Sequence, residues 1–355
     1  MGKAFKKGLL LCYRKYSLFN SLLNILRELS VEANGFDIRE ELSSFYLNIH
    51  SQIFRFPNKI RNQWESFFLR KANYILKRKI IEGSYDIIFV YNSEFLLPET
   101  CEEIKKNAKL VFFMGDSPFF TPVNPYYLRC LTYADLILSP DSFWINQLNT
   151  IGIKNTKYFI PGIDTSSYYL IDESNHSKKN ENLDIIYTGA SYVTSWGYKK
   201  ALLMNQFAGL NFRIYGNKAW EKWFKFFPEL KNHYTRSNYI STEKLNLLYN
   251  MSRLIPVDGN PGIINGFHLR MLEALGSGVL PLVEYRKDME ELIPESVGVK
   301  IPVIKDYSKA RNIAVYYLKN ETERRELVYA LRNFILSNYS AQNNAERIKE
   351  NLGKK

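Results

Sequence analysis

Between residues 265 and 284 the chain reads Asn265-Gly-Phe-His-Leu-Arg-Met-Leu-Glu-Ala-Leu-Gly-Ser-Gly-Val-Leu-Pro-Leu-Val-Glu284, a pattern typical of an amphipathic helix that ends at glycines and leads into a buried strand. Spacings of four, three and four residues put one polar set on a single helix face: Gly266, Arg270, Glu273 and Ser277. A second face, expected to pack on a sheet, consists of Phe267, Met271, Ala274 and Leu275. The segment therefore predicts a helix that covers a sheet and turns a cation and an anion toward a ligand.

The polar face of this helix suits a ligand that carries both phosphate and a pentose, as a nucleotide sugar does. The amino-terminal amides and Arg270 can donate to phosphate oxygens, and the Glu273 carboxylate can accept from ribose hydroxyls. The alternative for Arg270 and Glu273 is a simple ion pair, worth a few tenths of a kcal/mol. We include Asn265, Gly266 and His268 in the predicted ligand site, although His268 could equally be a loop or surface histidine.

The rest of the chain alternates strand-like and helical patterns. Continuous apolar runs predict strands at 9–13, 86–91, 110–114, 135–139 and 157–160, and again at 183–187, 211–215 and 254–257. Runs without polar alternation indicate strands buried on both faces, as in parallel sheets that helices cover. The expected fold class is therefore α/β, with two doubly wound, Rossmann-like domains.

The length of 355 residues also fits about two domains. A polar segment without periodicity at 163–182 is the predicted linker. We expect an N-terminal domain at 1–162, a C-terminal domain at 183–335, and a last helical segment at 336–355 that crosses back to the N-terminal domain.

The predicted strand ends carry two kinds of residue, and in open parallel sheets ligands bind beyond these ends. In the first half they are acidic or polar, suited to sugar hydroxyls or proton transfer: Asn92, Glu94, Asp116 and Asp141. In the second half they include glycines, suited to a close approach of backbone to phosphate: Gly189, Ala190, Ser191, Tyr215, Gly216, Asn217 and the loop from Asp258 to Gly266. This division predicts an acceptor-side domain and a phosphate-binding domain that face each other across a cleft.

Several of these residues have a purely local alternative. Gly189 could relieve crowding in a turn, and Asp116, which precedes Ser-Pro, could form an Asx turn. Glu94 and Asp141 could cap the helices that follow them.

Three more residues complete the predicted donor side. Tyr239 and Trp196 could stack on a base, or they could pack in the core. Lys218 is a second candidate for a phosphate-binding cation, after Arg270.

The composition is that of a soluble globular protein with a net charge of +12. Such a field concentrates anionic ligands, whether nucleotide-sugar phosphates, nucleic acid or an anionic membrane surface. The basic residues are spread along the chain without a long basic tail, which argues against nucleic acid, and a solvated basic surface is the plain alternative. Cys12, Cys101 and Cys130 form no CxxC or zinc spacing and the four histidines are scattered, so we expect no metal site.

The expected location is cytoplasmic. No apolar run reaches the length of a membrane span, and free thiols fit a reducing compartment. Residues 1–13 begin like a signal peptide, but the apolar core is short and Arg14-Lys15 follow at once. We expect a buried strand with a basic lead-in, and a peripheral contact with the cytoplasmic face of a membrane stays an open alternative.

Four segments of the second half follow one another in a known order: Ile185-Ile-Tyr-Thr-Gly189, Phe212-Arg-Ile-Tyr-Gly216, Leu248-Tyr-Asn-Met-Ser252 and Gly266-Phe-His-Leu-Arg-Met-Leu-Glu-Ala-Leu-Gly-Ser-Gly278. Together they resemble the C-terminal domain of group 1 glycosyltransferases with the GT-B fold. The spacing of Arg270, Leu272, Glu273 and Ala274, and the segment Phe113-Met-Gly-Asp-Ser-Pro118, resemble the CgeB-like, spore-maturation-protein branch. The resemblance covers 185–339 well and 86–164 loosely.

This resemblance implies a GT-B fold whose C-terminal helices pack back. It also implies metal-independent transfer of a sugar from a UDP- or GDP-type nucleotide sugar, a substrate and not a cofactor, to a glycan, lipid or protein acceptor. In that family the glutamate at the position of Glu273 binds the donor ribose, and glycines such as Gly189 and Gly216 line the nucleotide cleft. Arg270 would then stabilise the leaving diphosphate, and Asp116 would serve the acceptor side.

Three other functions stay open at this point. Asn265 stands where many group 1 enzymes have a second glutamate, and a glycine-rich acceptor loop is not evident, which motivates a non-catalytic GT-B subunit that binds a glycan or scaffolds a partner. The positive charge motivates a DNA-base glucosyltransferase. A sugar-nucleotide epimerase would share the fold, although two facing catalytic carboxylates are not apparent in the second half.

Overall fold

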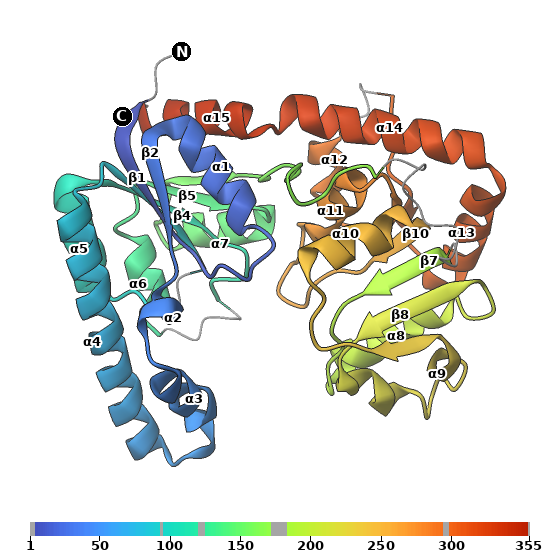
Figure 1. The fold of residues 1–355 in the computed structure, drawn as a ribbon, viewed down its shortest axis with the longest axis horizontal. Helices are drawn as coiled ribbons and strands as arrows, with labels where there is room; N and C mark the ends of the chain where they lie inside the picture. The colour runs from blue at the N-terminus through green and yellow to red at the C-terminus, as the bar shows by residue number, and fades with distance from the viewer. Residues whose placement is uncertain (1–3, 93–94, 120–124, 172–182, 294–297, 354–355) are drawn as a thin grey trace. The chain divides into compact units, whose positions relative to one another are not determined.

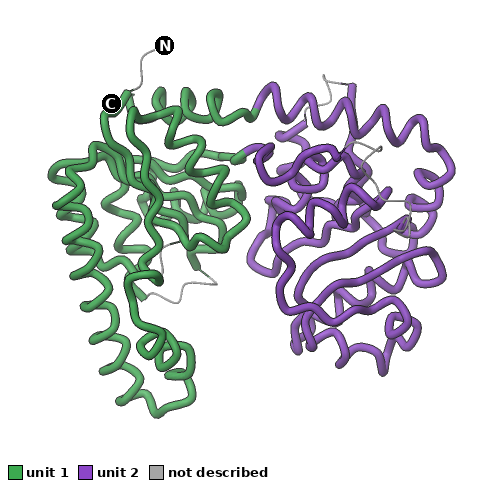
Figure 2. The backbone as a smooth tube through the Cα atoms, in the orientation of Figure 1, with its two compact units in different colours: residues 1–161, 339–355 green, residues 162–338 purple. Residues whose placement is uncertain are grey.

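A computed structural model describes residues 4–92, 95–119, 125–171, 183–293 and 298–353. The chain divides into two compact units (Figure 2). Unit 1 comprises residues 1–161 and 339–355, and unit 2 comprises residues 162–338. Of the predicted linker at 163–182, residues 163–171 belong to unit 2 and residues 172–182 lie outside the described part of the chain.

Unit 1 contains a six-stranded parallel sheet in the order β2-β1-β3-β4-β5-β6 (Figure 1). Its strands are β1 (Phe5–Leu11), β2 (Ser30–Phe36), β3 (Ile87–Tyr91), β4 (Lys109–Phe113), β5 (Leu136–Ser139) and β6 (Thr156–Tyr158). Every residue of β5 and nearly every residue of β3 and β4 is buried, because helices cover both faces of the sheet.

The helices of unit 1 connect these strands and cover the sheet. They are α1 (Phe19–Leu29), α2 (Ile38–Glu41), α3 (Ser44–Gln52), α4 (Asn58–Gly83), α5 (Pro98–Asn107), α6 (Tyr127–Leu131), α7 (Ser142–Thr150) and α15 (Ala341–Gly353), with a short 3₁₀ turn η1 (Ile53–Arg55) between α3 and α4. The last helix, α15, packs on α1, so that Ala345 and Ile348 enter the same core as Leu22 and Leu26.

Unit 2 repeats this plan with a second six-stranded parallel sheet, ordered β12-β11-β10-β7-β8-β9. Its strands are β7 (Leu183–Thr188), β8 (Phe212–Gly216), β9 (Tyr234–Arg236), β10 (Ser252–Val257), β11 (Leu280–Glu284) and β12 (Val303–Ile304). The principal helices are α8 (Ser195–Asn205), α10 (Thr242–Asn250), α11 (Arg270–Gly276), α13 (Ala310–Lys319) and α14 (Glu321–Asn338). The shorter ones are η3 (Lys218–Trp223), α9 (Leu230–His233), α12 (Met289–Leu292) and η5 (Tyr307–Lys309).

Both sheets reverse their strand order beside their first strand. In unit 1 the reversal lies between β1 and β3, and in unit 2 it lies between β7 and β10. Such a switch point leaves a crevice at the carboxyl ends of the two strands, where open α/β sheets bind their ligands. The predicted fold class, two doubly wound α/β domains, is therefore confirmed.

Two details of the secondary structure differ from the predictions. Strands β2, β9 and β12 were not expected, because they are short or polar strands at or near a sheet edge and lack a continuous apolar run. The helix predicted from about residue 265 begins only at Arg270, so Gly266 lies in the preceding loop and not on its polar face. Phe267 is nevertheless buried, and it packs from that loop.

Candidate functional site

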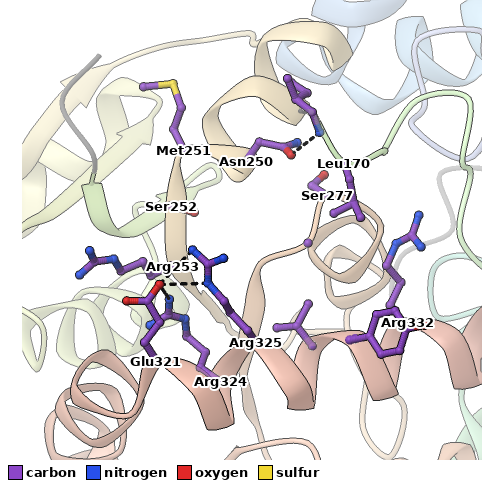
Figure 3. A pocket seen from close by; sticks show the side chains of 14 residues that line it. Leu170, Asn250, Met251, Ser252, Arg253, Ser277, Glu321, Arg324, Arg325 and Arg332 are labelled. Atoms are coloured by element: carbon purple, nitrogen blue, oxygen red, sulfur yellow. Dashed lines mark hydrogen bonds and ion pairs between the residues drawn. The ribbon is translucent and has the colours of Figure 1, made fainter. Parts of the chain in front are cut away.

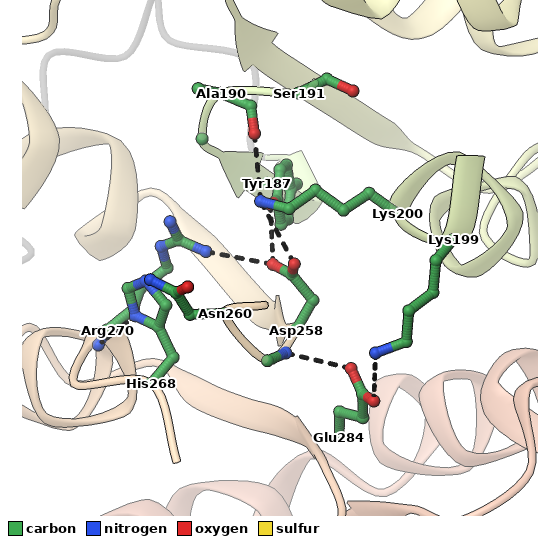
Figure 4. Close-up of polar contacts among 12 residues, drawn as sticks. Tyr187, Ala190, Ser191, Lys199, Lys200, Asp258, Asn260, His268, Arg270 and Glu284 are labelled. Atoms are coloured by element: carbon green, nitrogen blue, oxygen red, sulfur yellow. Dashed lines mark hydrogen bonds and ion pairs between the residues drawn. The ribbon is translucent and has the colours of Figure 1, made fainter. Parts of the chain in front are cut away.

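The carboxyl ends of β7 and β10 hold a buried ion cluster, which consists of Tyr187, Lys200, Asp258 and Arg270 (Figure 4). The Tyr187 hydroxyl donates to Asp258 Oδ1 at 2.7 Å. The Lys200 ammonium lies 3.2 Å from Asp258 Oδ2, and Arg270 Nη1 lies 3.5 Å from Asp258 Oδ1. The side chains of Lys200, Asp258 and Arg270 are 9%, 3% and 11% exposed, so one buried carboxylate holds two largely buried cations.

The strand order explains how residues so far apart in sequence meet. Tyr187 is the fifth residue of β7, and Asp258 directly follows β10, the neighbour of β7 in the sheet. Lys200 comes from α8, the helix that follows β7, and Arg270 opens α11, the helix that follows β10. Lys200 also donates to the Ala190 carbonyl at 3.0 Å, which ties α8 to the loop after β7.

The electrostatics of the cluster favour its charged state. Burial disfavours the ionised carboxylate of Asp258, but Lys200 and Arg270 outweigh it and hold the pKa of Asp258 below its usual range. Burial likewise acts against a charged Arg270, yet Tyr187, Tyr249 and the nearby carboxylates raise its pKa above the ordinary value. Arg270 is thus a permanent cation whose position is fixed before any ligand arrives.

Two predicted glycine-containing loops lie beside this cluster, at Gly189 and Gly216. A Cβ on Gly189 would lie 3.0 Å from Arg270 Nη2 and 2.9 Å from the Tyr187 hydroxyl, so the missing side chain keeps the guanidinium uncrowded. The Gly189 carbonyl accepts from the Trp220 indole N–H at 2.9 Å. A Cβ on Gly216 would press on the same indole, so the packing of Trp220 requires a glycine at position 216.

The loops after β7 and β8 are also joined through Asn217. Its side-chain oxygen accepts from the Ser191 amide at 2.9 Å, and its side-chain nitrogen donates to the Ser191 carbonyl at 3.2 Å. Ser191 is buried, whereas Ala190 is exposed. Of the three predicted residues after β7, Gly189 and Ala190 are thus open to a ligand, and Ser191 is a structural contact.

Glu273 lies one helical turn after Arg270 on α11. Its carboxylate lies close enough to Tyr168 and Tyr249 to add to burial in raising the pKa of both phenols. The Tyr249 hydroxyl is 2.9 Å from the Thr188 hydroxyl at the end of β7. Arg270 and Glu273 therefore point to the same strand end, and the carboxylate partner of Arg270 is Asp258 rather than Glu273 alone.

His268 stands at the start of α11 and is held as a neutral ring. Its Nδ1 accepts from the Arg270 amide at 3.1 Å, which leaves the proton on Nε2. Burial, followed by the neighbouring Arg270 charge, lowers the pKa of His268 to about 3. The predicted neighbours Asn265 and Gly266 lie in the loop before it; the Asn265 carbonyl accepts from the Asp288 amide at 3.0 Å, which fixes this loop.

The remaining predicted donor-side residues lie at the rim. Lys218 is exposed at the start of η3, and Tyr215 is half-buried near the end of β8. Tyr239 is 70% exposed, so it is not a core residue. Trp196 is half-buried, and the Lys199 ammonium lies 4.2 Å from its ring centroid.

A second ion cluster stands next to the first, around Glu284 at the end of β11. Its carboxylate pairs with Lys199, lies 3.2 Å from Arg286 Nη2 and accepts from the Gly259 amide at 3.0 Å (Figure 4). Gly259 follows Asp258 directly, so Glu284 positions the loop that carries the first cluster.

In unit 1 the structure brings together two predicted residues, Asn92 and Asp116, at the ends of β3 and β4. Asn92 adopts a left-handed conformation with φ of 42°, accepts from the Gly115 amide at 2.7 Å and donates to Asp116 Oδ2 at 3.0 Å. Burial raises the pKa of Asp116. A strained asparagine that orients a half-buried carboxylate is typical of a functional position.

The two other predicted acceptor-side residues do not join this pair. Asp141 is fully buried and caps α7, where its carboxylate accepts from the Phe143 amide at 2.8 Å, so the capping alternative describes it. Glu94 lies outside the described residues.

Sequence reasoning missed Tyr187, Lys200 and Asp258 as members of the site. Tyr187 lies inside an apolar strand-like run, and the residue spacing of the helix that carries Lys200 does not mark this lysine as a site residue. Asp258 was recognised only as the start of a strand-end loop. The pair Lys199-Lys200 within a predicted helix is the available signal, since a lysine on a covered helix face needs a partner.

A pocket of about 760 Å³ lies elsewhere in unit 2, at the amino end of β10 (Figure 3). Its arginines have partners: Arg325 Nε donates to Glu321 Oε1 at 3.0 Å, and Arg253 Nη1 lies 3.0 Å from Asp184 Oδ1. Because this pocket is not at the carboxyl edge of the sheet, it plays no part in the candidate site. Among the described residues no group of three or more His, Cys, Asp or Glu side chains is arranged to hold a metal.

The two six-stranded parallel sheets with their covering helices match the fold of solved GT-B glycosyltransferases. Residues 199–350 match a family model described as "Glycosyl transferase-like". The chain is similar to Anabaena Alr3699/HepE in complex with UDP-glucose, at 12% identity and a TM-score of 0.66, with 98% of this chain and 100% of that chain covered. It is similar to sucrose-phosphate synthase of Thermosynechococcus elongatus at 11% identity and a TM-score of 0.66, covering 97% and 98%.

The same fold extends to another kind of enzyme. A putative UDP-N-acetylglucosamine 2-epimerase of Listeria monocytogenes is similar at 14% identity and a TM-score of 0.59, with 98% and 95% covered. No curated protein sequence matches the chain. These likenesses establish the fold of the chain.

Proposed function

We propose that this protein is a glycosyltransferase that moves a sugar from a nucleotide sugar to an acceptor hydroxyl or amine without a bound metal. The observation that carries the proposal is the fixed guanidinium of Arg270. It lies against the side-chain-free Gly189 at the switch point of the unit 2 sheet, and Asp258 holds it there. A permanent cation at this edge suits the diphosphate of a sugar donor.

In the proposed reaction the bond between the anomeric carbon and the diphosphate oxygen breaks, and its electron pair remains on the diphosphate. Arg270 stabilises this developing charge, with Lys218 at the rim as a second cation. The acceptor oxygen or nitrogen forms the new bond to the anomeric carbon and loses its proton. We assign that acceptor side to unit 1, where Asp116, oriented by Asn92, is the candidate group to take the proton.

The rest of the donor site follows from the same geometry. Glu273, one turn after Arg270, is the proposed acceptor of hydrogen bonds from the ribose hydroxyls. The loops at Gly189 and Gly216 would line the nucleotide, and the exposed ring of Tyr239 is available to stack on the base. Neutral His268, with its proton on Nε2, can donate to a sugar hydroxyl or a phosphate oxygen.

Two comparisons support the proposal. The family model that matches residues 199–350 is described as glycosyl transferase-like, and the matched range includes Lys200, Asp258, Arg270 and Glu273 of the unit 2 site. The similar Anabaena protein was crystallised with UDP-glucose, which makes UDP-glucose a first donor to test. The spacing of Arg270 and Glu273 leads us to place the chain in the CgeB-like branch, with a glycan, lipid or protein as acceptor.

The first experiment is a thermal-shift panel of UDP, GDP and their sugars with the purified protein. A ligand at roughly 100 times its Kd should add about 2.7 kcal/mol to the free energy of unfolding. The donor selected in this way is then tested for release of the nucleoside diphosphate and for sugar transfer.

The decisive variant is Arg270→Ala. Loss of a fixed contact to the leaving group should lower kcat by about 10²–10³-fold with saturating donor. Full turnover by Arg270→Ala would overturn the role of this residue. Binding without hydrolysis or transfer would point to a non-catalytic GT-B subunit, and release of an isomerised free sugar would point to an epimerase.

A further inference from the structure

An exposed aromatic and basic surface lies at the tip of unit 1, in the connection between β2 and β3. It comprises α3, η1 and the first ten residues of α4, that is residues 44–67, which we call the aromatic tip (Figure 1). Within these residues, all of which the structure describes, Ile53 is the one buried side chain. The buried residues of α4 begin at Phe68, so only the later part of that helix packs on the unit.

The aromatic tip exposes an unusual amount of apolar surface for a soluble unit. Five large apolar side chains within 23 residues are about half exposed or more: Phe45 at 66%, Phe54 at 63%, Phe56 at 51%, Ile60 at 49% and Phe67 at 49%. Singly scattered apolar residues need no explanation, but a concentration of this kind within one short segment marks a surface that a membrane or another molecule covers.

Basic side chains are interleaved with these aromatic rings. Residues 44–67 contain three cations, Arg55, Lys59 and Arg61, and one carboxylate, Glu65, a net charge of +2. Glu65 Oε1 lies 2.7 Å from Arg61 Nε. Arg55 and Lys59 therefore give the tip its positive charge, and Arg70 and Lys71 follow on α4.

Aromatic rings and cations also contact one another within the tip. The guanidinium carbon of Arg55 lies 5.4 Å from the centroid of Phe54, and the Lys71 ammonium lies 4.5 Å from that of Tyr46. Tyr46 stacks beside Trp64 with centroids 6.0 Å apart, and Phe67 is 5.8 Å from Trp64. Of the exposed rings, Phe45 and Phe67 therefore pack on the half-buried rings of Tyr46 and Trp64.

We propose that the aromatic tip docks this protein on an anionic lipid bilayer. Phenylalanine side chains enter the boundary between head groups and acyl chains, while lysine and arginine side chains remain with the anionic head groups. The contact would be peripheral, since no helix in the described residues is long and apolar enough to cross a membrane.

The test is co-sedimentation of the full-length protein with vesicles, in the absence of any sugar nucleotide. Vesicles of neutral phosphatidylcholine are compared with vesicles in which about a third of the lipid is anionic phosphatidylglycerol. The protein should sediment with the anionic vesicles and be released by salt, because the attraction is partly screened by ions.

Two variants and one control isolate the tip. The triple variant Phe45→Ser, Phe54→Ser, Phe56→Ser should lose about tenfold or more in partition to anionic vesicles. The double variant Arg55→Glu, Lys59→Glu should lose at least about tenfold as well, through charge. A control with Val31, Phe226 and Tyr329 each replaced by serine removes side chains of similar exposure elsewhere and should bind like the wild type.

Several results would overturn the proposal. They are equal binding to neutral and anionic vesicles, a loss in the control as large as in the tip variants, and no sedimentation with either vesicle. Tip-dependent dimerisation, or tip-dependent binding of single-stranded nucleic acid without vesicle binding, would replace it. The donor-induced thermal shift of the tip variants is measured in parallel and should equal that of the wild type, so failure here is separate from failure of the proposed activity.

Discussion

The carboxyl edges of the two sheets are built on the same strand plan and carry different chemistry. In unit 2 the edge gathers buried charge, with Asp258 between Lys200 and Arg270. In unit 1 the end of β4 is followed by a half-buried carboxylate, Asp116, which accepts from the side-chain amide of Asn92. The difference teaches that the switch point supplies a crevice in both units, while the residues that follow each strand decide what the crevice can bind.

The sharpest test of this contrast removes one carboxylate from each edge. Asp258→Ala leaves Lys200 and Arg270 buried without their shared anion, so we expect a loss of about 3–5 kcal/mol in the free energy of unfolding. Asp116→Ala removes a carboxylate with one hydrogen bond and should cost about 1 kcal/mol or less. Both are measured by chemical denaturation followed by circular dichroism.

A second-site change controls for this interpretation. Adding Lys200→Met to Asp258→Ala removes one of the unpaired cations and should restore part of the lost stability. If Asp116→Ala and Asp258→Ala cost the same, the contrast between the edges would fail.

The pH dependence of stability offers the next largest effect. The pKa of His268 falls from 6.5 to about 3 on folding, so the folded protein holds the ring neutral where the unfolded chain protonates it. Stability from this group is complete above pH 6.5 and is lost as the pH falls toward 3, by up to about 1.5 kcal/mol between pH 6.5 and 5.

His268→Asn should flatten this part of the profile. Subtracting the profile of the variant from that of the wild type isolates His268 from His50 of unit 1, whose pKa burial also lowers. Identical profiles would show that His268 is not held neutral by the folded state.

A third comparison uses one glycine from each edge. Gly189→Ala would place a methyl group against the Arg270 guanidinium, so we expect about tenfold weaker donor binding, or about 1.4 kcal/mol. Gly115→Ala would instead press on the Tyr91 ring in unit 1 and should leave donor affinity unchanged. Isothermal titration with the nucleoside diphosphate distinguishes the two, and equal losses would contradict a donor site confined to unit 2.

The smallest losses of stability are expected at two helix caps that have no part in the proposed reaction. Asp141→Ala removes the cap of α7 and should cost about 1 kcal/mol, and Ser241→Ala, the cap of α10, about half as much. Thermal unfolding measures both. A loss of turnover in Asp141→Ala beyond the loss of folded protein would return Asp141 to the acceptor side.

The architecture could be predicted because the central strands have a distinctive sequence pattern. Ile87–Tyr91 and Leu136–Ser139 are continuous apolar runs, which only a sheet covered on both faces accommodates. Edge strand β2, with the sequence Ser-Val-Glu-Ala-Asn-Gly-Phe, has exposed positions along its length and lacks a continuous apolar run. Its pairing with β1 depends on neighbours that are distant in the sequence.

The candidate site was predictable in part for a similar reason. Arg270, Glu273 and Gly189 stand in local patterns, a helix start and a strand end, that sequence spacing reveals. The counter-charge of Arg270 is Asp258, twelve residues away across a loop, and Lys200 arrives from a helix that follows another strand. Such a meeting is set by strand order, which spacing along the chain does not encode.

The return of the last helix to unit 1 has a consequence for synthesis on the ribosome. Ala345 and Ile348 complete a core that begins with Leu10 and Leu22, so unit 1 cannot close that core until unit 2 has been translated in full. Unit 2 is contiguous and can fold while the ribosome is still adding residues. A premature stop shortly after residue 338 would therefore damage the unit that was made first and spare the one made second.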